Sequence, residues 1–235
     1  MKILGMDSSS RCRSVALCEA GDGTDGAFKV LASVGAASMR GGRFASLIDE
    51  VLSEAGCAVD EVDELALGVG PGSAAGIRST LAFALGWEAA SRARMTAFSS
   101  MWGLAAQARL QGIQGEVTGA VAGPARQLYV SRFRIESHSI LQLEPLEQIG
   151  RLDLRGRVRA RDHWIGPDVG LWFDQSDPSI PEKIPVRRTD LLPSGTSVAF
   201  LRHIECVEAE VKPEPIALGM ARFAKAPPPR NIPDP

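Results

Sequence analysis

The chain has 235 residues, 45% of them hydrophobic, and a formal net charge of −2. This length can bury two modest hydrophobic cores, and the near-neutral charge gives no general sign of nucleic-acid binding. No run of about 18 apolar residues could span a membrane, and no signal-peptide pattern opens the chain. We therefore expect a cytoplasmic protein. The four cysteines form no Cys-x-x-Cys pair, which favours reduced thiols over a zinc site or disulfides.

The first part of the chain mixes strand and helix patterns. We expect strands at 2–6, 14–19, 29–34 and 64–69, and helices at 43–55 and 74–94. In the first helix, apolar residues recur at steps of three and four, and Gly56 is well placed to end it. This order indicates an α/β fold that starts with strands and packs helices on one side.

The first two strands form a hairpin whose tip is polar. Asp7, Ser8, Ser9 and Ser10 lie between the strands at 2–6 and 14–19. A carboxylate beside hydroxyl groups can face a metal ion or phosphates, which makes Asp7, Ser8 and Ser9 candidates for a phosphate-facing or nucleotide-facing site. The alternative is an ordinary hairpin with a soluble tip.

A glycine-rich turn joins the strand at 64–69 to the helix at 74–94. Residues 68–78 read Gly-Val-Gly-Pro-Gly-Ser-Ala-Ala-Gly-Ile-Arg. A turn of this kind exposes backbone N–H groups at the positive end of a helix, so Gly70, Gly72 and Ser73 are further phosphate-facing candidates. The segment matches neither a Walker A loop nor a dinucleotide-binding fingerprint. A tight structural turn remains the alternative.

From Ser99 onward the pattern restarts. We expect a short helix to about Ala108, strands near 116–122, 127–135 and 138–144, loops over 166–195 and a helix over 196–210. This organisation predicts an N-terminal subdomain at 1–98 and a C-terminal α/β subdomain at 99–225. The proline-rich residues 226–235 are expected to be a disordered tail. No internal sequence repeat stands out.

Four arginines alternate with small or apolar residues at 155–161. Arg155, Arg157, Arg159 and Arg161 would share one face of a strand. Arg157 and Arg159 are therefore candidates for contact with tRNA phosphates or an acidic partner surface. A solvated strand face, or a charged edge that blocks sheet pairing, is the alternative.

Three segments together resemble the bacterial TsaB (YeaZ) family. They are Ile-Leu-Gly-Met-Asp-Ser-Ser-Ser at 3–10 with Ser-Val-Ala-Leu at 14–17, the turn at 68–78, and Pro-Ala-Arg-Gln-Leu-Tyr at 124–129. The resemblance implies an actin-like, sugar-kinase-like (ribonuclease H-like) ATPase fold with two small α/β subdomains. The family's Phe-Thr is Ala74-Ala75 here, and its Asp before Ala-Arg is Pro124. The C-terminal family motif is also largely missing, which puts individual contacts in doubt.

The resemblance implies a noncatalytic subunit rather than an enzyme. TsaB pairs with TsaD and supports transfer of a threonylcarbamoyl group to the adenosine beside the tRNA anticodon, with TsaE in the larger complex. TsaD holds a metal with two histidines, and Ser100 and Leu104 take those positions here. The three histidines are far apart, so we expect neither a metal nor a cofactor. An independent ATPase or phosphotransferase of the same superfamily remains the alternative.

The two N-terminal helices are also candidates for an intersubunit contact. The helix at 74–94 is apolar or small around much of its circumference, which is typical of a helix that meets more than one neighbour. In the TsaB and TsaD families these helices bind TsaD or a second copy of the chain. The resemblance then implies these interface residues: Phe44, Leu47, Ile48, Ile77, Arg78, Leu81, Phe83 and Leu85. Contact with tRNA is expected mainly through the complex.

Overall fold

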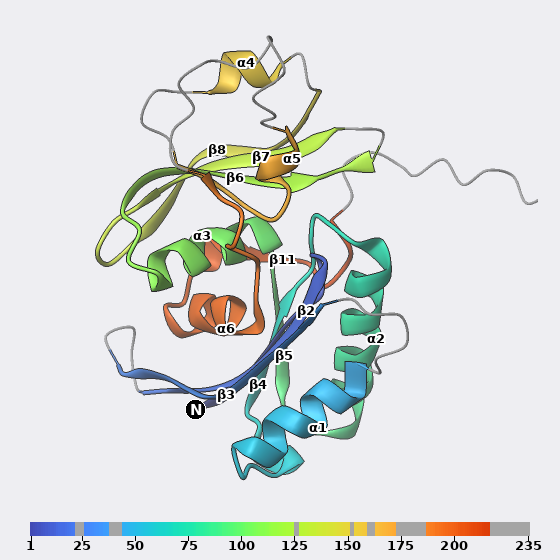
Figure 1. Cartoon of the computed structure of the whole chain (residues 1–235). Helices are drawn as coiled ribbons and strands as arrows, with labels where there is room; N and C mark the ends of the chain where they lie inside the picture. Colours follow the sequence, from blue (N-terminus) through green and yellow to red (C-terminus); the bar gives the residue numbers. More distant parts are fainter. Residues whose placement is uncertain are drawn as a thin grey trace, which may run out of the picture.

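The structure is a computed structural model with two β-sheets and six α-helices among its described residues (Figure 1). It describes residues 1–21, 26–37, 44–124, 127–150, 153–158, 163–172 and 187–216. Within that part of the chain, no helix is long and apolar enough to cross a membrane.

The first sheet has six strands in the order β11-β5-β4-β1-β2-β3. These strands are β1 (Lys2–Asp7), β2 (Cys12–Ala20), β3 (Phe28–Ala37), β4 (Glu64–Gly68), β5 (Arg94–Phe98) and β11 (Glu210–Val211). The first three strands are antiparallel, while β1, β4 and β5 run parallel. The linking helices are α1 (Phe44–Glu54) and α2 (Ala74–Ala90).

The second sheet repeats this topology with five strands in the order β10-β9-β6-β7-β8. Its strands are β6 (Gly115–Ala122), β7 (Leu128–Ile135), β8 (Ile140–Ile149), β9 (His163–Ile165) and β10 (Arg187–Arg188). The helices of this half are α4 (Leu154–Arg157) and α5 (Val169–Trp172), and each half ends in a further helix, α3 (Ser100–Leu110) or α6 (Gly195–His203). The chain therefore contains one supersecondary unit twice, without a visible sequence repeat.

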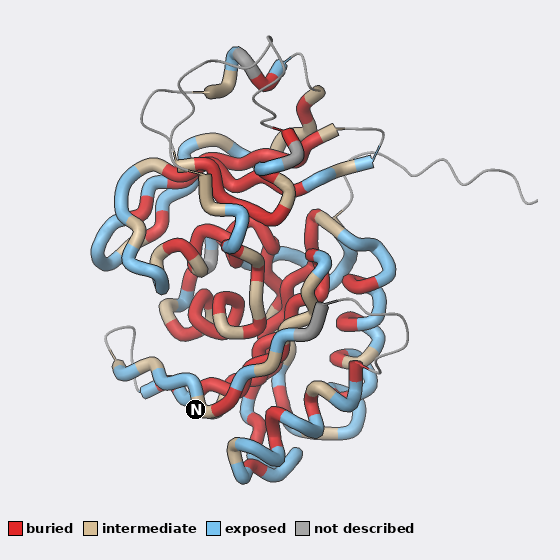
Figure 2. The backbone as a smooth tube through the Cα atoms, viewed as in Figure 1, coloured by how far each residue is buried: buried red, intermediate tan, exposed pale blue. Residues whose placement is uncertain are grey.

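The central strands β1 and β4 of the first sheet are buried on both faces, as parallel strands between helices require. Leu4 and Met6 of β1 point into the core under α1 and α2, whereas Ile3 points into a second core with α3, α6 and the inner face of the other sheet. A third, smaller core lies under α4 and α5 on the outer face of the second sheet. Figure 2 shows α3 and α6 as buried elements between the two sheets.

The sequence patterns locate most elements in the first two thirds of the chain. The predicted strands at 2–6, 14–19, 29–34 and 64–69 correspond to β1 to β4, and the three later ones to β6 to β8. The helix expected at 74–94 is too long, because it ends at Ala90 and β5 begins at Arg94. Good helix-forming residues precede this strand, but parallel pairing with β4 determines its conformation.

The strand predicted across 155–161 is wrong where the structure describes it. Leu154–Arg157 form one helical turn, α4, so Arg155 and Arg157 do not lie on a strand. Arg159 and Arg161 lie outside the described residues, as does the expected tail at 226–235. The helix expected at 196–210 ends at His203, and Glu210–Val211 form β11 instead.

The last described helix packs directly on the first sheet. Gly5 of β1 and Gly195 of α6 approach so closely that a methyl group on Gly5 would overlap the Gly195 carbonyl oxygen. Arg202 adds a bidentate ion pair to Glu64 of β4, with an Nη2–Oε1 distance of 2.8 Å. Residues from the second half of the sequence thus complete the first sheet's packing, although the predicted subdomain boundary falls near residue 98.

This contact predicts a large difference between two glycine substitutions. Gly5→Ala should lower the free energy of unfolding by about 3 kcal/mol, because a backbone carbonyl cannot move aside. Gly86→Ala should raise the free energy of unfolding by about 0.5 to 1 kcal/mol, because Ala favours a helix and a methyl group at this site on α2 would meet no atom within 4 Å beyond the neighbouring helix backbone. Urea unfolding measures both. Equal effects would contradict the Gly5–Gly195 contact.

Candidate functional site

The hairpin tip and the glycine-rich turn meet at one end of the first sheet. The Ser73 N–H donates to the Ser9 carbonyl oxygen at 2.6 Å. A methyl group on Gly72 would overlap that same oxygen, and one on Gly76 would overlap the Ser8 carbonyl oxygen. Since only glycine permits this approach, the sequence Gly-Pro-Gly-Ser-Ala-Ala-Gly fits the hairpin tip onto the first turn of α2.

Asp7 is the central polar group of this arrangement. Its carboxylate is fully buried and accepts three hydrogen bonds: from the Ser9 N–H (2.8 Å), the Ser9 hydroxyl (2.7 Å) and the Ser100 hydroxyl (2.7 Å). Burial raises the pKa of Asp7 above its ordinary value, and the bonds from Ser9 and Ser100 partly oppose this. Asp7 therefore joins its own strand end to the N-terminus of α3.

Ser100 connects the same carboxylate to the glycine-rich turn. Its hydroxyl accepts a hydrogen bond from the Gly70 N–H at 2.9 Å, and its N–H donates to the Gly70 carbonyl oxygen at 2.7 Å. The sequence patterns do not indicate that Ser100 is a partner of Asp7. Its place just after β5 is the available signal, because the carboxyl ends of β1, β4 and β5 share one sheet edge.

The six phosphate-facing candidates are thus brought together, but mostly facing one another. Asp7, Ser8, Ser9 and Gly70 are buried, Gly72 is half-buried and Ser73 is exposed. Ser73 caps α2 by accepting from the Gly76 N–H at 3.3 Å. The Ser8 and Ser9 carbonyl oxygens, rather than an added anion, lie against the first turn of α2. Phosphate binding by these residues stays a prediction.

The two positions that correspond to the metal-binding histidines of TsaD do not suit a metal in this chain. Ser100 is committed to Asp7 and Gly70, and Leu104 lies in the core between the sheets. Neither side chain can replace an imidazole ligand. Among the described residues, no group of three His, Cys, Asp or Glu side chains is placed to hold a metal ion.

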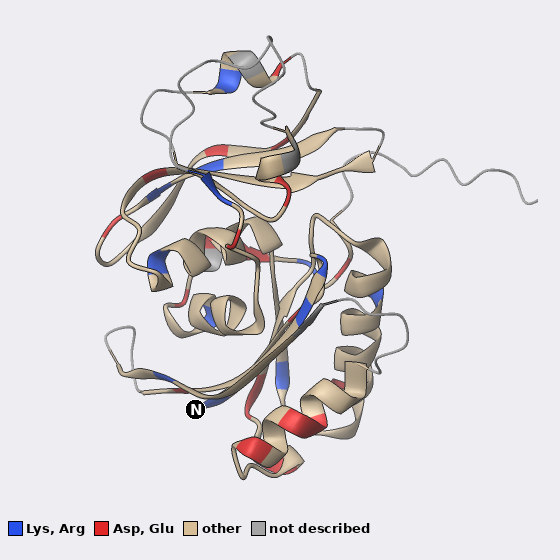
Figure 3. Cartoon of the chain, viewed as in Figure 1, with Lys and Arg blue, Asp and Glu red and all other residues tan. Residues whose placement is uncertain are grey.

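The expected interface residues divide into a buried and an exposed set. Phe44, Ile48, Ile77 and Leu81 are buried in the core of the first sheet, whereas Leu47 and Phe83 are half-buried. Arg78 and Leu85 are exposed, and Leu85 is 51% exposed. Only two of the 17 residues of α2 are charged, the exposed Arg78 and Glu88, so Figure 3 draws most of this helix in tan.

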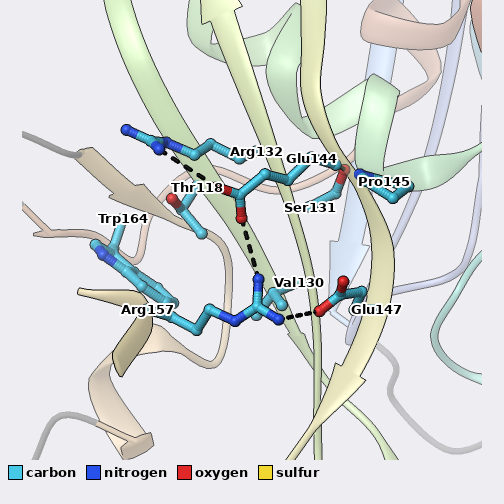
Figure 4. Close-up of a pocket in the computed structure, with 9 residues that line it drawn as sticks. All are labelled: Thr118, Val130, Ser131, Arg132, Glu144, Pro145, Glu147, Arg157 and Trp164. Carbon is cyan, nitrogen blue, oxygen red and sulfur yellow. Dashed lines mark hydrogen bonds and ion pairs between the residues drawn. The ribbon is translucent and has the colours of Figure 1, made fainter. Parts of the chain in front are cut away.

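Arg157 belongs to a row of alternating charges on the outer face of the second sheet. It binds Glu144 at 3.2 Å and also Glu147, and Figure 4 shows its guanidinium group between these two carboxylates. Arg132 continues the row by binding Glu144 at 3.4 Å and Glu116. Carboxylates of the same chain therefore already offset the positive charge of Arg157.

Comparisons with known proteins identify related sequences and folds. The model of the family described as "TsaD: tRNA N6-adenosine threonylcarbamoyltransferase" matches residues 41–220. The structure of YeaZ from Pseudomonas aeruginosa is similar to this chain with a TM-score of 0.73 and 21% sequence identity, over 92% of this chain and 99% of YeaZ. No curated protein matches the chain.

A second solved structure gives the same result. It is described as an uncharacterized protein with similarity to peptidase YeaZ from Pseudomonas aeruginosa, and it has a TM-score of 0.73 and 22% identity over 93% of this chain and 99% of its own. At these identities the likeness shows the fold. The predicted α/β fold, in the form that YeaZ has, and the predicted family relationship are both confirmed.

The hydrogen bonds of Asp7 predict a graded loss of stability. Asp7→Ala should lower the free energy of unfolding by about 3 kcal/mol, because three buried donors lose their acceptor. Asp7→Asn keeps an acceptor and should cost less. Because the folded-state pKa is raised, the stability of the unchanged protein relative to Asp7→Asn should fall as the pH rises from 3.8 through the folded-state pKa. Urea unfolding across this pH range tests both expectations. If the stability of the unchanged protein relative to Asp7→Asn rose with pH, the raised pKa would be contradicted.

In this row of charges, we expect the more buried arginine to contribute more to the stability of the fold. The Arg132 side chain is 7% exposed and the Arg157 side chain 38%. Arg132→Leu should destabilise the protein by about 2 to 3 kcal/mol, because it removes one partner of buried ion pairs. Arg157→Leu should cost less than about 1 kcal/mol, and its effect should shrink in high salt. Equal losses in urea unfolding would refute this ranking.

Proposed function

The chain belongs to the TsaD family, and we propose that it is a noncatalytic subunit that pairs with TsaD and supports threonylcarbamoyl transfer to the adenosine beside the tRNA anticodon. The observation that carries this proposal is the internal use of the groups that could do chemistry. Asp7, Ser9, Ser100 and Gly70 hydrogen-bond one another in a buried cluster. These groups stabilise the fold where a catalytic relative would have reacting groups.

The side chains at the positions of the TsaD histidine pair support the same proposal. A TsaD-type site needs two imidazoles, and this chain has a committed hydroxyl at Ser100 and an aliphatic side chain at Leu104. A threonylcarbamoyl transfer that depends on such a site therefore has to take place on the partner. The role left to this chain is to bind and position.

The outer face of α2 supports a protein partner. Exposed positions of this helix are mainly small, which lets another helix approach its backbone closely. Leu85 adds an exposed apolar side chain, and the ring of Phe83 packs against the rings of Phe44 and Trp87. We propose this face, with the exposed part of α1, as the binding surface for TsaD.

The remaining partners follow from the same role. TsaE joins the larger complex, and tRNA is contacted mainly through that complex, in the cytoplasm. When TsaD is absent, the same α2 face can pair two copies of the chain. The alternating arginines also suggested Arg157 and Arg159 for contacts with tRNA or an acidic surface, but the carboxylate partners of Arg157 make it a weaker candidate than that pattern suggested.

A charge placed on the α2 face should abolish or weaken pairing. Leu85→Glu should weaken the affinity for TsaD at least about tenfold, because an unpaired carboxylate would be buried in the contact. Leu85 is preferred over Leu81 because Leu81 is buried in the core, where a charge would unfold the protein. Calorimetric titration with TsaD from the same source measures the affinity.

The matched control is Leu141→Glu on β8 of the second sheet, where the leucine is 47% exposed. The affinity of the Leu141→Glu variant for TsaD should equal that of the unchanged chain. Equal affinity of the Leu85→Glu variant would refute the surface. Failure of the unchanged chain to bind TsaD, together with ATP hydrolysis by the chain alone, would support the alternative of an independent ATPase or phosphotransferase.

A further inference from the structure

The C-terminal end of the described chain crosses the sheet edge that carries the glycine-rich turn. β11 pairs with β5, with Glu210 opposite Phe98 and Val211 opposite Ala97. Residues 212–216, here called the C-terminal strap, then continue from β5 to the end of β4. At the far end of the strap, the Ile216 N–H donates to the Val69 carbonyl oxygen at 2.9 Å.

This bond completes the pairing of the peptide groups that lead into α2. The Val69 N–H donates to Phe98, and both polar groups of Gly70 bind Ser100. Val69 and Gly70 together have two N–H and two carbonyl groups. Three of these four groups bind residues 98–100, and the fourth, the Val69 carbonyl, accepts from the Ile216 N–H. Val69 is fully buried, so its carbonyl oxygen would lose its protein partner without the strap.

The sequence of the strap leaves the Ile216 N–H as a backbone donor for the turn. Residues 213 and 215 are prolines, which lack an N–H group and have a fixed backbone torsion. The Glu214 N–H bonds within the strap, to the Lys212 carbonyl oxygen at 2.8 Å. Ile216 then supplies a backbone donor to the turn, and its side chain packs against the core beneath α1 and α2.

We propose that the C-terminal strap is a positioning element that fixes the turn before α2 and thereby sets the geometry of the partner-binding face. Ile216 is its positioning residue, acting through Val69 and Gly70 on the first turns of α2. The inference rests on the proposed function in one respect only, which is that the α2 face binds TsaD.

The test compares two truncations and two substitutions in the otherwise full chain. One truncation lacks residues 217–235 and keeps the strap, and the other lacks residues 212–235. Ile216→Ala removes most of the side-chain packing, and Ile216→Val restores most of it. The readouts are TsaD affinity by calorimetry and amide hydrogen exchange across α2 in the unbound protein.

We expect the chain without residues 217–235 and the Ile216→Val variant to bind TsaD within twofold of the full chain. The chain without residues 212–235 and the Ile216→Ala variant should bind about tenfold more weakly. Their amide exchange should accelerate in the first two turns of α2 and stay unchanged in β6 and β7. This locality separates positioning of α2 from a general loss of stability.

Two results would overturn the inference. One is unchanged exchange in α2 for both strap-disrupting variants, and the other is acceleration spread equally over the two sheets. If the full chain does not bind TsaD, the proposed function fails, and hydrogen exchange still decides whether the strap holds α2. If exchange changes as expected while the affinity for TsaD does not, the strap holds α2 but does not set the geometry of the partner-binding face, which refutes the proposal.

Discussion

The fold of the first half depends on one buried carboxylate. Asp7 accepts hydrogen bonds from Ser9 beside it and from Ser100, which is 93 residues further along the chain. Through Ser100 the same network reaches Gly70, so three strand ends and the starts of α2 and α3 share one polar cluster. A buried charge without such partners would be strongly unfavourable. The network therefore explains why a polar hairpin tip can be packed inside the protein.

Much of the fold is readable from the sequence because its strands and helices follow simple periodicities. The elements and element ends missed by sequence reasoning are those whose conformation depends on distant partners. β5 follows a helix-forming segment, and β8 continues through Pro145, which is tolerated because β8 lies at the edge of its sheet. The alternating arginines suggested a strand, but residues 154–157 form a helical turn whose last residue, Arg157, binds Glu144 and Glu147.

The candidate site shows the same limit. The sequence places Asp7, Ser9 and Gly70 in turns, and the observed pairing of β1, β4 and β5 brings these turns to one sheet edge. It does not show whether the turns leave room for a ligand or pack on each other. That outcome depends on Gly72 and Gly76, whose lack of side chains admits the Ser8 and Ser9 carbonyl oxygens, and on the hydroxyl of Ser100. A glycine-rich turn can therefore serve close backbone packing as well as anion binding.

The repeated topology explains why partner binding should be assigned to the first half. Each half has a strand, a turn containing Gly and Pro, and a helix in equivalent places, with β4 and α2 in one half and β9 and α5 in the other. α2 has 17 residues and α5 has four. A helix of four residues has about one turn and offers little surface, whereas α2 spans more than four turns. Of these two equivalent helices, within the residues that the structure describes, α2 alone is long enough to present a continuous face with few charges to another protein.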